Sequence, residues 1–149
     1  MKKISIVSSC FNEEDNIPIL YRGINEVIEK YIERYEFEFI FIDNDSTDFS
    51  QDELRKLAMD DKRVKLIFNS RNFGYIKSAY YAIMQASGDA VIYLASDLQD
   101  PPELIADFID NWEKGCDVVI ARKYDKKSFS FLNILRKFYY FALDLMKDE

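Results

Sequence analysis

Asp97 and Gln99 have the residue types and the spacing that most directly indicate chemistry. They stand two positions apart, Asp100 follows, and the pair Pro101-Pro102 comes next. A carboxylate and an amide oxygen so placed can share one Mg²⁺ or Mn²⁺, with the oxygens of a diphosphate completing its octahedral coordination. The two prolines predict the start of a helix, whose N–H groups add positive potential beside an anion. The segment therefore predicts a metal-assisted diphosphate site.

The elements that must position these residues alternate between strand and helix patterns. Short apolar runs predict strands, and apolar residues repeated every three or four positions predict helices. Such alternation predicts right-handed crossovers and a mostly parallel sheet covered on both faces, which is a three-layer α/β/α fold. The expected strands are Lys3–Ser8, Phe37–Ile42, Val64–Phe68, Ala90–Leu94 and Asp117–Ala121. The expected helices run from Ile17 to Tyr35, over Asp52–Met59 and Gly74–Ala86, from Pro101 to Trp112, and from Phe131 to Leu145.

Polar residues follow every expected strand. In open α/β sheets, ligands bind beyond the carboxyl ends of the strands, so these residues are candidates for a site. Any one such segment is more often a solvated loop with a helix cap, but five at one sheet edge favour a binding site. The segments are 9–14, 43–48, 69–74, 95–100 and the pair Arg122-Lys123.

Composition limits the chemistry further. The chain has 149 residues, which fits one domain, and a net charge of −7, which disfavours general nucleic-acid binding. It has no histidine, so Ser-His-Asp catalysis, Cys-His catalysis and His-ligated zinc are excluded as usually built. Cys10 and Cys116 show no metal or redox spacing. Because no leader and no membrane-length apolar stretch is present, we expect a protein that is cytoplasmic or sits peripherally on the cytoplasmic membrane face.

Four motifs give the sequence a resemblance to a known family. Asp97–Ile105 (DLQDPPELI) and Ser70–Gly74 (SRNFG) are the most specific, and Phe11–Glu14 and Asp43–Asp48 match the family's first two motifs. The sequence resembles the inverting nucleotide-sugar glycosyltransferases of family 2, which have the GT-A fold. Within them it is similar to the branch of dolichyl-phosphate mannose synthase and bacterial polyprenyl-phosphate glycosyltransferases. The resemblance covers residues 3 to about 145.

The resemblance implies a role for each matching position. It implies that Asp97 and Gln99 ligate Mg²⁺ or Mn²⁺, and that Asp97 and Arg122 act in catalysis by offsetting charge on a departing diphosphate. The implied reaction transfers a sugar, with inversion, from a nucleoside-diphosphate sugar to a polyprenyl phosphate or a cell-envelope glycan. The residues implied in nucleotide-sugar binding are Phe11, Asn12, Glu13, Asp43, Asn44, Arg71, Asn72 and Ser96.

The sequence departs from the family pattern in four respects. Ala95-Ser96-Asp97 stands where the family usually has Asp-Ala-Asp, Asn44 replaces a carboxylate, and Tyr75 stands where relatives often carry Lys. Family members also continue past this length with an acceptor-side segment. We therefore expect residues 1–149 to be a single nucleotide-sugar-binding domain that lacks its C-terminal acceptor side. A nucleotide-sugar-binding module or fragment without turnover remains the alternative.

The C-terminal stretch raises the question of a membrane. Residues 122–137 carry six basic side chains against one acidic, with aromatic residues interleaved. Such a segment could lie on the anionic inner face of the membrane, or could be a helix packed on the domain with a solvated basic face. Both interpretations stay open, and exposed aromatic surface there would also favour self-association.

Two other α/β classes fit less well. A Rossmann dehydrogenase domain is disfavoured because no G-x-G-x-x-G follows the first expected strand. A phosphoryl-receiver domain needs an acidic pair after the first strand and a lysine after the fifth. Glu13, Glu14 and Lys123 imitate that pattern loosely, but Asp97–Ile105 has no place in it.

Overall fold

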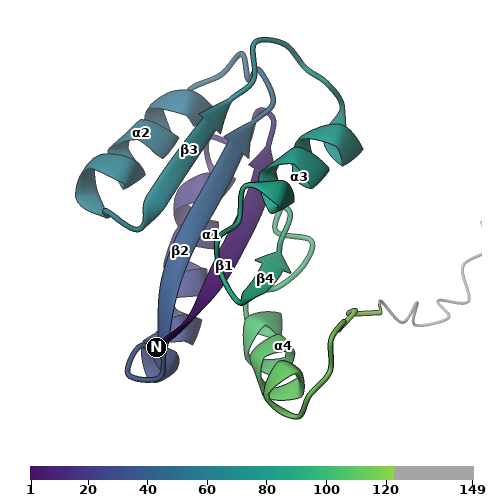
Figure 1. The fold of residues 1–149 in the computed structure, drawn as a ribbon. Coiled ribbons are helices and arrows are strands. Elements are labelled where there is room, and N and C mark those ends of the chain that lie inside the picture. The colour runs from purple at the N-terminus through teal and green to yellow at the C-terminus, as the bar shows by residue number, and fades with distance from the viewer. Residues whose placement is uncertain (123–149) are drawn as a thin grey trace, which may run out of the picture.

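Strands and helices alternate along residues 1–122, the part of the chain that the computed structural model describes (Figure 1). None of the described helices is both long enough and apolar enough to cross a membrane. The elements are β1 (Lys2–Cys10), α1 (Asn16–Ile28), the 3-10 turn η1 (Glu29–Tyr31), β2 (Tyr35–Asp43), α2 (Ser50–Asp60), β3 (Val64–Phe68), α3 (Tyr75–Met84), β4 (Ala90–Tyr93) and α4 (Leu104–Glu113).

The four strands form one parallel sheet in the order β3-β2-β1-β4. In the centre of the sheet Ile6 pairs with Phe39 on one side and with Ile92 on the other. The strand order therefore reverses between β1 and β4: the chain first moves outward from β1 to β3 and then returns to place β4 on the other side of β1. Parallel strands end at the same edge, so the loops after all four strands meet there.

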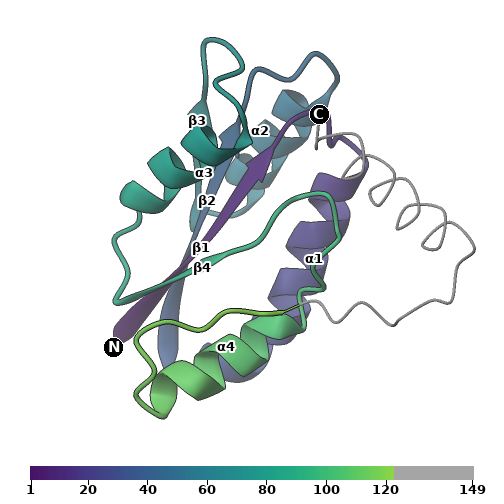
Figure 2. The same ribbon diagram turned by 90° about the vertical axis from the view of Figure 1, so that its right-hand side faces the viewer.

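Helices cover both faces of this sheet (Figure 2). Side chains of α1, α2 and α4 pack with Ile6, Phe39 and Phe41 in the larger core. On the opposite face Ala82 of α3 packs with Val7 of β1 and with Ile40 and Ile42 of β2 in a smaller core. Both faces of β1 and β2 are thus buried, as is usual for parallel strands covered on both sides, and the α3 face also carries the buried polar residues Ser5, Ser9 and Glu38. The expected three-layer α/β/α fold is confirmed.

Two helix boundaries differ from the expectation. The first helix ends at Ile28, and η1 leads to a strand that begins at Tyr35. Tyr31 and Tyr35 imitate helical spacing, but the ring of Tyr35 packs against Trp112 at the start of the strand. The last described helix begins at Leu104 because Pro101 and the two residues after it form a turn, in which Leu104 N–H donates to the Pro101 carbonyl at 3.1 Å.

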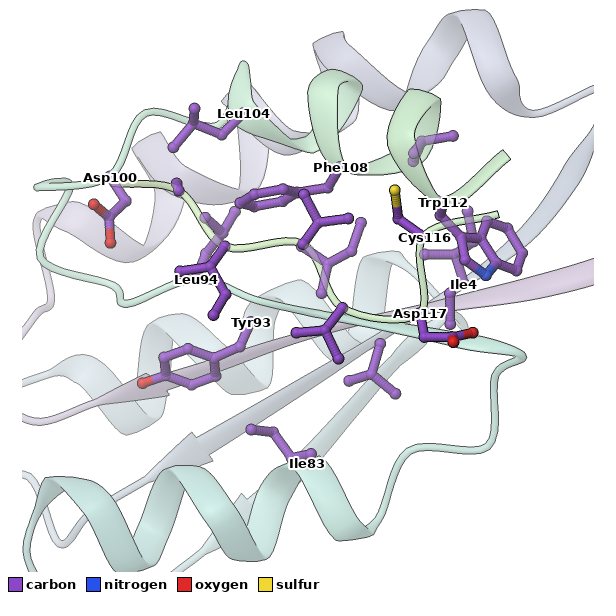
Figure 3. A pocket seen from close by; sticks show the side chains of 18 of the residues that line it. Ile4, Ile83, Tyr93, Leu94, Asp100, Leu104, Phe108, Trp112, Cys116 and Asp117 are labelled. Carbon is purple, nitrogen blue, oxygen red and sulfur yellow. The ribbon is translucent and has the colours of Figure 1, made fainter. Parts of the chain in front are cut away.

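The expected strand at Asp117–Ala121 is wrong. Within residues 1–122, β4 pairs only with β1, and this segment has no regular secondary structure. Val118 and Ile120 are 77% and 82% exposed. Residues 116–121 and β4 line a cavity of about 740 Å³ together with α4 (Figure 3). The β-branched composition predicted an extended path, but a strand also needs a partner edge within hydrogen-bonding reach. The expected helix from Phe131 to Leu145 lies outside the described residues.

A buried carboxylate lies on the α3 side of the sheet. Glu38 of β2 is 4% exposed and accepts hydrogen bonds from Lys65 Nζ at 2.6 Å, Ser5 Oγ at 2.5 Å and Ser87 N–H at 2.7 Å. Burial alone would raise the pKa of Glu38, but these donors outweigh it and lower the pKa to about 2. Gly88 packs closely here, because a Cβ at that position would lie 2.7 Å from Ser5 Oγ. The network is far from the strand ends that carry the candidate site.

Candidate functional site

A cavity of about 260 Å³ opens at the carboxyl end of the sheet. It lies where the strand order reverses between β1 and β4, which is where open α/β sheets bind ligands. Its walls come from the segments that follow β1, β2, β3 and β4. The lining residues are Ser9, Cys10, Phe11, Glu13, Asn44, Asn72, Tyr75, Ser78, Ala95, Ser96 and Asp97.

The larger cavity beside α4 has a different character. It is walled mainly by aliphatic and aromatic side chains such as Leu104, Phe108 and Trp112 (Figure 3). The smaller cavity instead gathers two carboxylates, two amides and three serine hydroxyls. A polar ligand is specified by such convergent polar groups, so the smaller cavity is the candidate functional site. We call it the β1/β4 cavity.

Backbone strain is concentrated in the loops around this cavity. In the described residues, the non-glycine residues with positive φ are Asn12 (57°), Asp45 (65°) and Leu98 (56°). They follow β1, β2 and β4, respectively. Asn and Asp adopt this left-handed conformation readily, whereas it costs about 1–2 kcal/mol for a residue such as Leu98. Strain of this kind is held in place at functional sites, which supports a role for the loop after β4.

Leu98 lies between the two expected metal ligands. Its left-handed turn brings the Gln99 N–H to 3.1 Å from Asp97 Oδ1, and both Asp97 and Gln99 are exposed. In residues 1–122 no group of three or more carboxylates or cysteines could hold a metal by itself. A metal here would therefore need ligand phosphate oxygens and water to complete its shell. That donor set fits Mg²⁺ or Mn²⁺, which proteins often bind through one or two side-chain oxygens plus substrate phosphates.

Asn44 holds the loops together from beneath the cavity. It is 5% exposed, and its Oδ1 accepts from Ser78 Oγ at 2.8 Å, Phe73 N–H at 3.0 Å and Asn69 Nδ2 at 3.1 Å. Its Nδ2 donates to Asn72 Oδ1 at 2.8 Å. Because the amide oxygen already accepts three bonds, Asn44 acts mainly by fixing Asn72 and the start of α3.

Asp43 is the residue before Asn44, and its side chain lies on the opposite face of the sheet. It is fully buried, and its Oδ2 accepts from Gln51 Nε2 at 2.8 Å and Ser46 N–H at 3.1 Å. Its Oδ1 is buried without a hydrogen-bond partner in the described residues. Burial, and then the charge of Asp43, raise the pKa of the Cys10 thiol, so Cys10 is a neutral group here. The unpartnered oxygen is an acceptor that a water molecule or a ligand donor could satisfy.

The loops after β1 and β2 are bound to each other. Asn12 Oδ1 accepts from Thr47 N–H at 2.8 Å, and Asn12 N–H donates to Ser46 Oγ at 2.9 Å. Glu13 N–H donates to Ser50 Oγ at 2.7 Å. These bonds place Phe11 and Glu13 at the cavity wall, while Asn12 itself positions the loop.

The structure brings together about half of the predicted site residues. Phe11, Glu13, Asn44, Asn72, Ser96 and Asp97 line the cavity. Asn12, Asp43, Arg71, Gln99 and Arg122 do not. Arg71 instead lies over the Phe73 ring, 4.7 Å from its centroid. Arg122 is exposed at the end of the described residues.

Five cavity residues received no individual role from the sequence, although Ser9, Cys10 and Ala95 fall in the candidate segments 9–14 and 95–100; the other two are Tyr75 and Ser78. Ser9 and Cys10 are the last residues of β1, and Tyr75 and Ser78 lie one turn apart at the start of α3. The strand end directly before Phe11 was a usable signal for the first two. For Tyr75 and Ser78 the usable signal was their helical spacing just after Gly74, which presents both to one side.

These features define a class. A parallel three-layer α/β domain with a polar cavity at the reversal of its strand order is a nucleotide-binding type of architecture. The particular family follows from sequence: the family model for glycosyl transferase family 2 matches residues 5–148, and the chain belongs to that family.

Named relatives agree with this assignment. A bactoprenol glucosyl transferase of Shigella phage SfV is 39% identical over 126 residues, which are 85% of this chain and 40% of that protein. A prophage bactoprenol glucosyl transferase homolog of Escherichia coli (strain K12) is 38% identical over 126 residues, with the same coverage of 85% and 40%. The chain thus spans about 40% of the length of these curated relatives.

Solved structures share the fold. Staphylococcus aureus TarS 1–349 matches with a TM-score of 0.63 and 22% identity, over 86% of this chain and 40% of that one. The mannosyltransferase PcManGT from Pyrobaculum calidifontis, in complex with GDP-Man and Mn²⁺, matches with a TM-score of 0.56 and 19% identity, over 64% of this chain and 28% of that one. At these identities the likeness concerns the fold.

Proposed function

We propose that the β1/β4 cavity binds a nucleoside-diphosphate sugar with Mg²⁺ or Mn²⁺, as the donor-binding part of an inverting glycosyltransferase. The observation that carries the proposal is the position of Asp97, exposed on a strained loop beside Gln99 and at the wall of a polar cavity. Family membership supports the reaction class. A fold neighbour in complex with GDP-Man and Mn²⁺ supports the donor and the metal.

Different residues of the cavity would contact different parts of the donor. Phe11 offers an exposed aromatic face for a nucleoside, and Glu13 and the Asn72 amide offer polar contacts at the same wall. Asp97 and Gln99 would hold the metal through their oxygens. The bound metal would offset the negative charge that builds on the diphosphate as the sugar leaves. Ser96 is 2% exposed and donates to the Ser9 carbonyl at 2.8 Å, which keeps Asp97 at the cavity mouth.

The acceptor is proposed to be a polyprenyl phosphate, with a cell-envelope glycan as the other candidate. Relatives named bactoprenol glucosyl transferases support the lipid acceptor. A phosphate oxygen is already ionised, so attack on the anomeric carbon would need little general-base help. With such an acceptor the transfer would take place at the cytoplasmic membrane face, with the protein in peripheral contact with the membrane. The basic stretch that would make this contact lies outside the described residues, except for Arg122.

A nucleotide-sugar-binding module without turnover is the second candidate. Ala95 lines the cavity two residues before Asp97 and supplies no carboxylate there. Metal-dependent nucleotide binding fits both candidates, whereas hydrolysis or transfer of the donor sugar fits only the enzyme.

Thermal unfolding tests donor binding directly. With UDP, GDP or CDP at ~100 times the dissociation constant, and with Mn²⁺ present, one nucleotide should raise the unfolding midpoint by roughly 5–10 °C. The rise should disappear when EDTA removes the metal. A rise that occurs equally with and without metal would contradict the metal site, and no rise with any nucleotide would contradict donor binding by this chain.

A further inference from the structure

Tyr75 lies at the wall of the β1/β4 cavity, yet neither the motifs nor the comparisons assign it a role. It is the first residue of α3 and is 57% exposed. Its ring meets the ring of Tyr93 edge to face, with centroids 6.2 Å apart and planes at 73°. Its ring therefore has a fixed neighbour, while more than half of the residue remains exposed at the cavity wall.

Tyr93 is itself anchored to the floor of the site. Its ring lines the larger cavity beside β4 (Figure 3), and its hydroxyl shares a hydrogen bond of 2.5 Å with Ser9 Oγ. Burial, with further contributions from Tyr75 and Asp97, raises the pKa of Tyr93, so its hydroxyl stays protonated. The Ser9 carbonyl accepts from Ser96 Oγ at 2.8 Å. Contacts thus connect Ser96 to the Ser9 carbonyl, the Ser9 hydroxyl to Tyr93, and the ring of Tyr93 to the ring of Tyr75.

The charge of the cavity makes neutral donors necessary. Its lining includes the carboxylates of Glu13 and Asp97 and, within residues 1–122, no Lys or Arg. A diphosphate beside Asp97 would carry several acceptor oxygens that one metal ion cannot all satisfy. Each buried acceptor left without a donor costs about 1–3 kcal/mol, so hydroxyl and amide donors must meet the remaining oxygens.

Most of the cavity's side-chain donors already have partners within the described part of the chain. Ser78 Oγ donates to Asn44 Oδ1, and Asn44 Nδ2 donates to Asn72 Oδ1. Ser96 Oγ donates to the Ser9 carbonyl, and the Ser9 hydroxyl is engaged with Tyr93. Tyr75 has a side-chain hydrogen-bond interaction with Tyr93 that raises the pKa of Tyr93, which makes the Tyr75 oxygen the acceptor and leaves its own hydrogen to be donated. Within residues 1–122, the Asn72 amide hydrogens and the Tyr75 hydroxyl hydrogen are thus the side-chain donors at the cavity wall that can turn to a ligand.

We propose that Tyr75 is a ligand-binding residue whose phenol hydroxyl donates a hydrogen bond to the diphosphate of the donor nucleotide. Tyr93 and Ser9 hold its ring at the cavity wall, and so act as positioning residues. The inference rests on the proposed function, because it takes the ligand to be a nucleoside diphosphate. It adds an uncharged contact to the diphosphate besides the metal.

The test compares Tyr75→Phe with the matched control Tyr80→Phe. Tyr80 lies on the same helix, is 65% exposed and does not line the cavity. Dissociation constants are measured by titration calorimetry with Mn²⁺, first for the nucleoside diphosphate that binds the wild-type chain best and then for the nucleoside without phosphates. Tyr75→Phe should weaken diphosphate binding roughly three- to tenfold and leave nucleoside binding unchanged. Tyr80→Phe should change neither.

Three results would overturn the inference, and they are distinguishable. Equal diphosphate affinity for Tyr75→Phe and Tyr80→Phe would show that the hydroxyl makes no contact. Equal loss for the diphosphate and the nucleoside would place the hydroxyl on the base or the ribose. If the wild-type chain binds none of the nucleotides, the proposed function falls, and the role of Tyr75 falls with it. Unfolding midpoints equal to that of the wild-type chain would confirm that both variants are folded, so that differences in the dissociation constant report binding alone.

Discussion

Replacing Asp97 with asparagine is expected to weaken metal-dependent nucleotide binding by roughly 100-fold, equivalent to about 2.7 kcal/mol. Asparagine keeps the side-chain size and an oxygen that can accept the 3.1 Å bond from Gln99 N–H, so the strained loop should persist. What is lost is the negative charge that Mg²⁺ or Mn²⁺ requires from its protein ligand. Titration calorimetry with the preferred nucleotide and Mn²⁺ measures the change.

Two further variants make that result specific. Gln99→Ala removes a neutral ligand and should cost less, on the order of tenfold, because the carboxylate remains. Asp60→Asn, at the exposed end of α2, removes the same charge far from the cavity and should leave affinity unchanged. If Asp97→Asn binds nucleotide and metal as the wild-type chain does, the metal assignment is wrong.

The second large effect concerns stability and arises from Glu38. Its pKa is lowered from 4.5 to about 2 in the folded chain. As the pH falls below 4.5, Glu38 is therefore protonated in the unfolded chain while it is still ionised in the folded chain. The free energy of unfolding should therefore lose about 2–3 kcal/mol as the pH falls from about 4.5 through about 2, and this contribution should be fully present above that range. Asp61, whose pKa is also lowered to about 2 by its bonds from Arg63 and Tyr21, adds to the same loss.

Denaturant unfolding at pH 7 and pH 3 separates the two carboxyl groups. Glu38→Gln should lower the free energy of unfolding at pH 7 by about 2–3 kcal/mol and remove its share of the pH dependence. Glu36→Gln serves as the control, because Glu36 lies on the same strand and is exposed. An unchanged pH dependence in Glu38→Gln would mean that the buried network does not hold the charged form of Glu38.

The order of layers and four of the five expected strands could be predicted from sequence. In runs such as Phe37–Ile42 nearly every residue on both faces is apolar, Glu38 being the exception, and only a sheet covered on both sides buries both faces. The segment Asp117–Ala121 is also mainly apolar and rich in β-branched residues, but composition reports the preference for an extended backbone and not the presence of a partner edge. Tyr35 was misassigned for a related reason, since two residues four apart suffice to imitate a helix.

The candidate site was predictable where a residue follows a strand and points to the cavity. Phe11, Glu13 and Asp97 are of this kind, and the cavity gathers all three. The roles of Asn12 and Asn44 could not be predicted, because both side chains satisfy loop backbone groups tens of residues away in sequence. Tyr75 was recognised only as a departure from the family pattern. Its place at the cavity wall depends on its ring contact with Tyr93, which is in turn bonded to Ser9, and sequence spacing does not connect these three residues.

The measurement that tests the central claim most directly is paramagnetic broadening of backbone amide NMR signals by Mn²⁺ in the presence of the preferred nucleoside diphosphate. Binding of the metal–nucleotide complex at the β1/β4 cavity predicts that broadening is strongest for residues 9–13 and 96–99 and that the far end of α2 and η1 keep their signals. The same experiment on Asp97→Asn should show little selective broadening. Broadening centred elsewhere, for example on the acidic end of α2 at Asp60 and Asp61, would contradict the account.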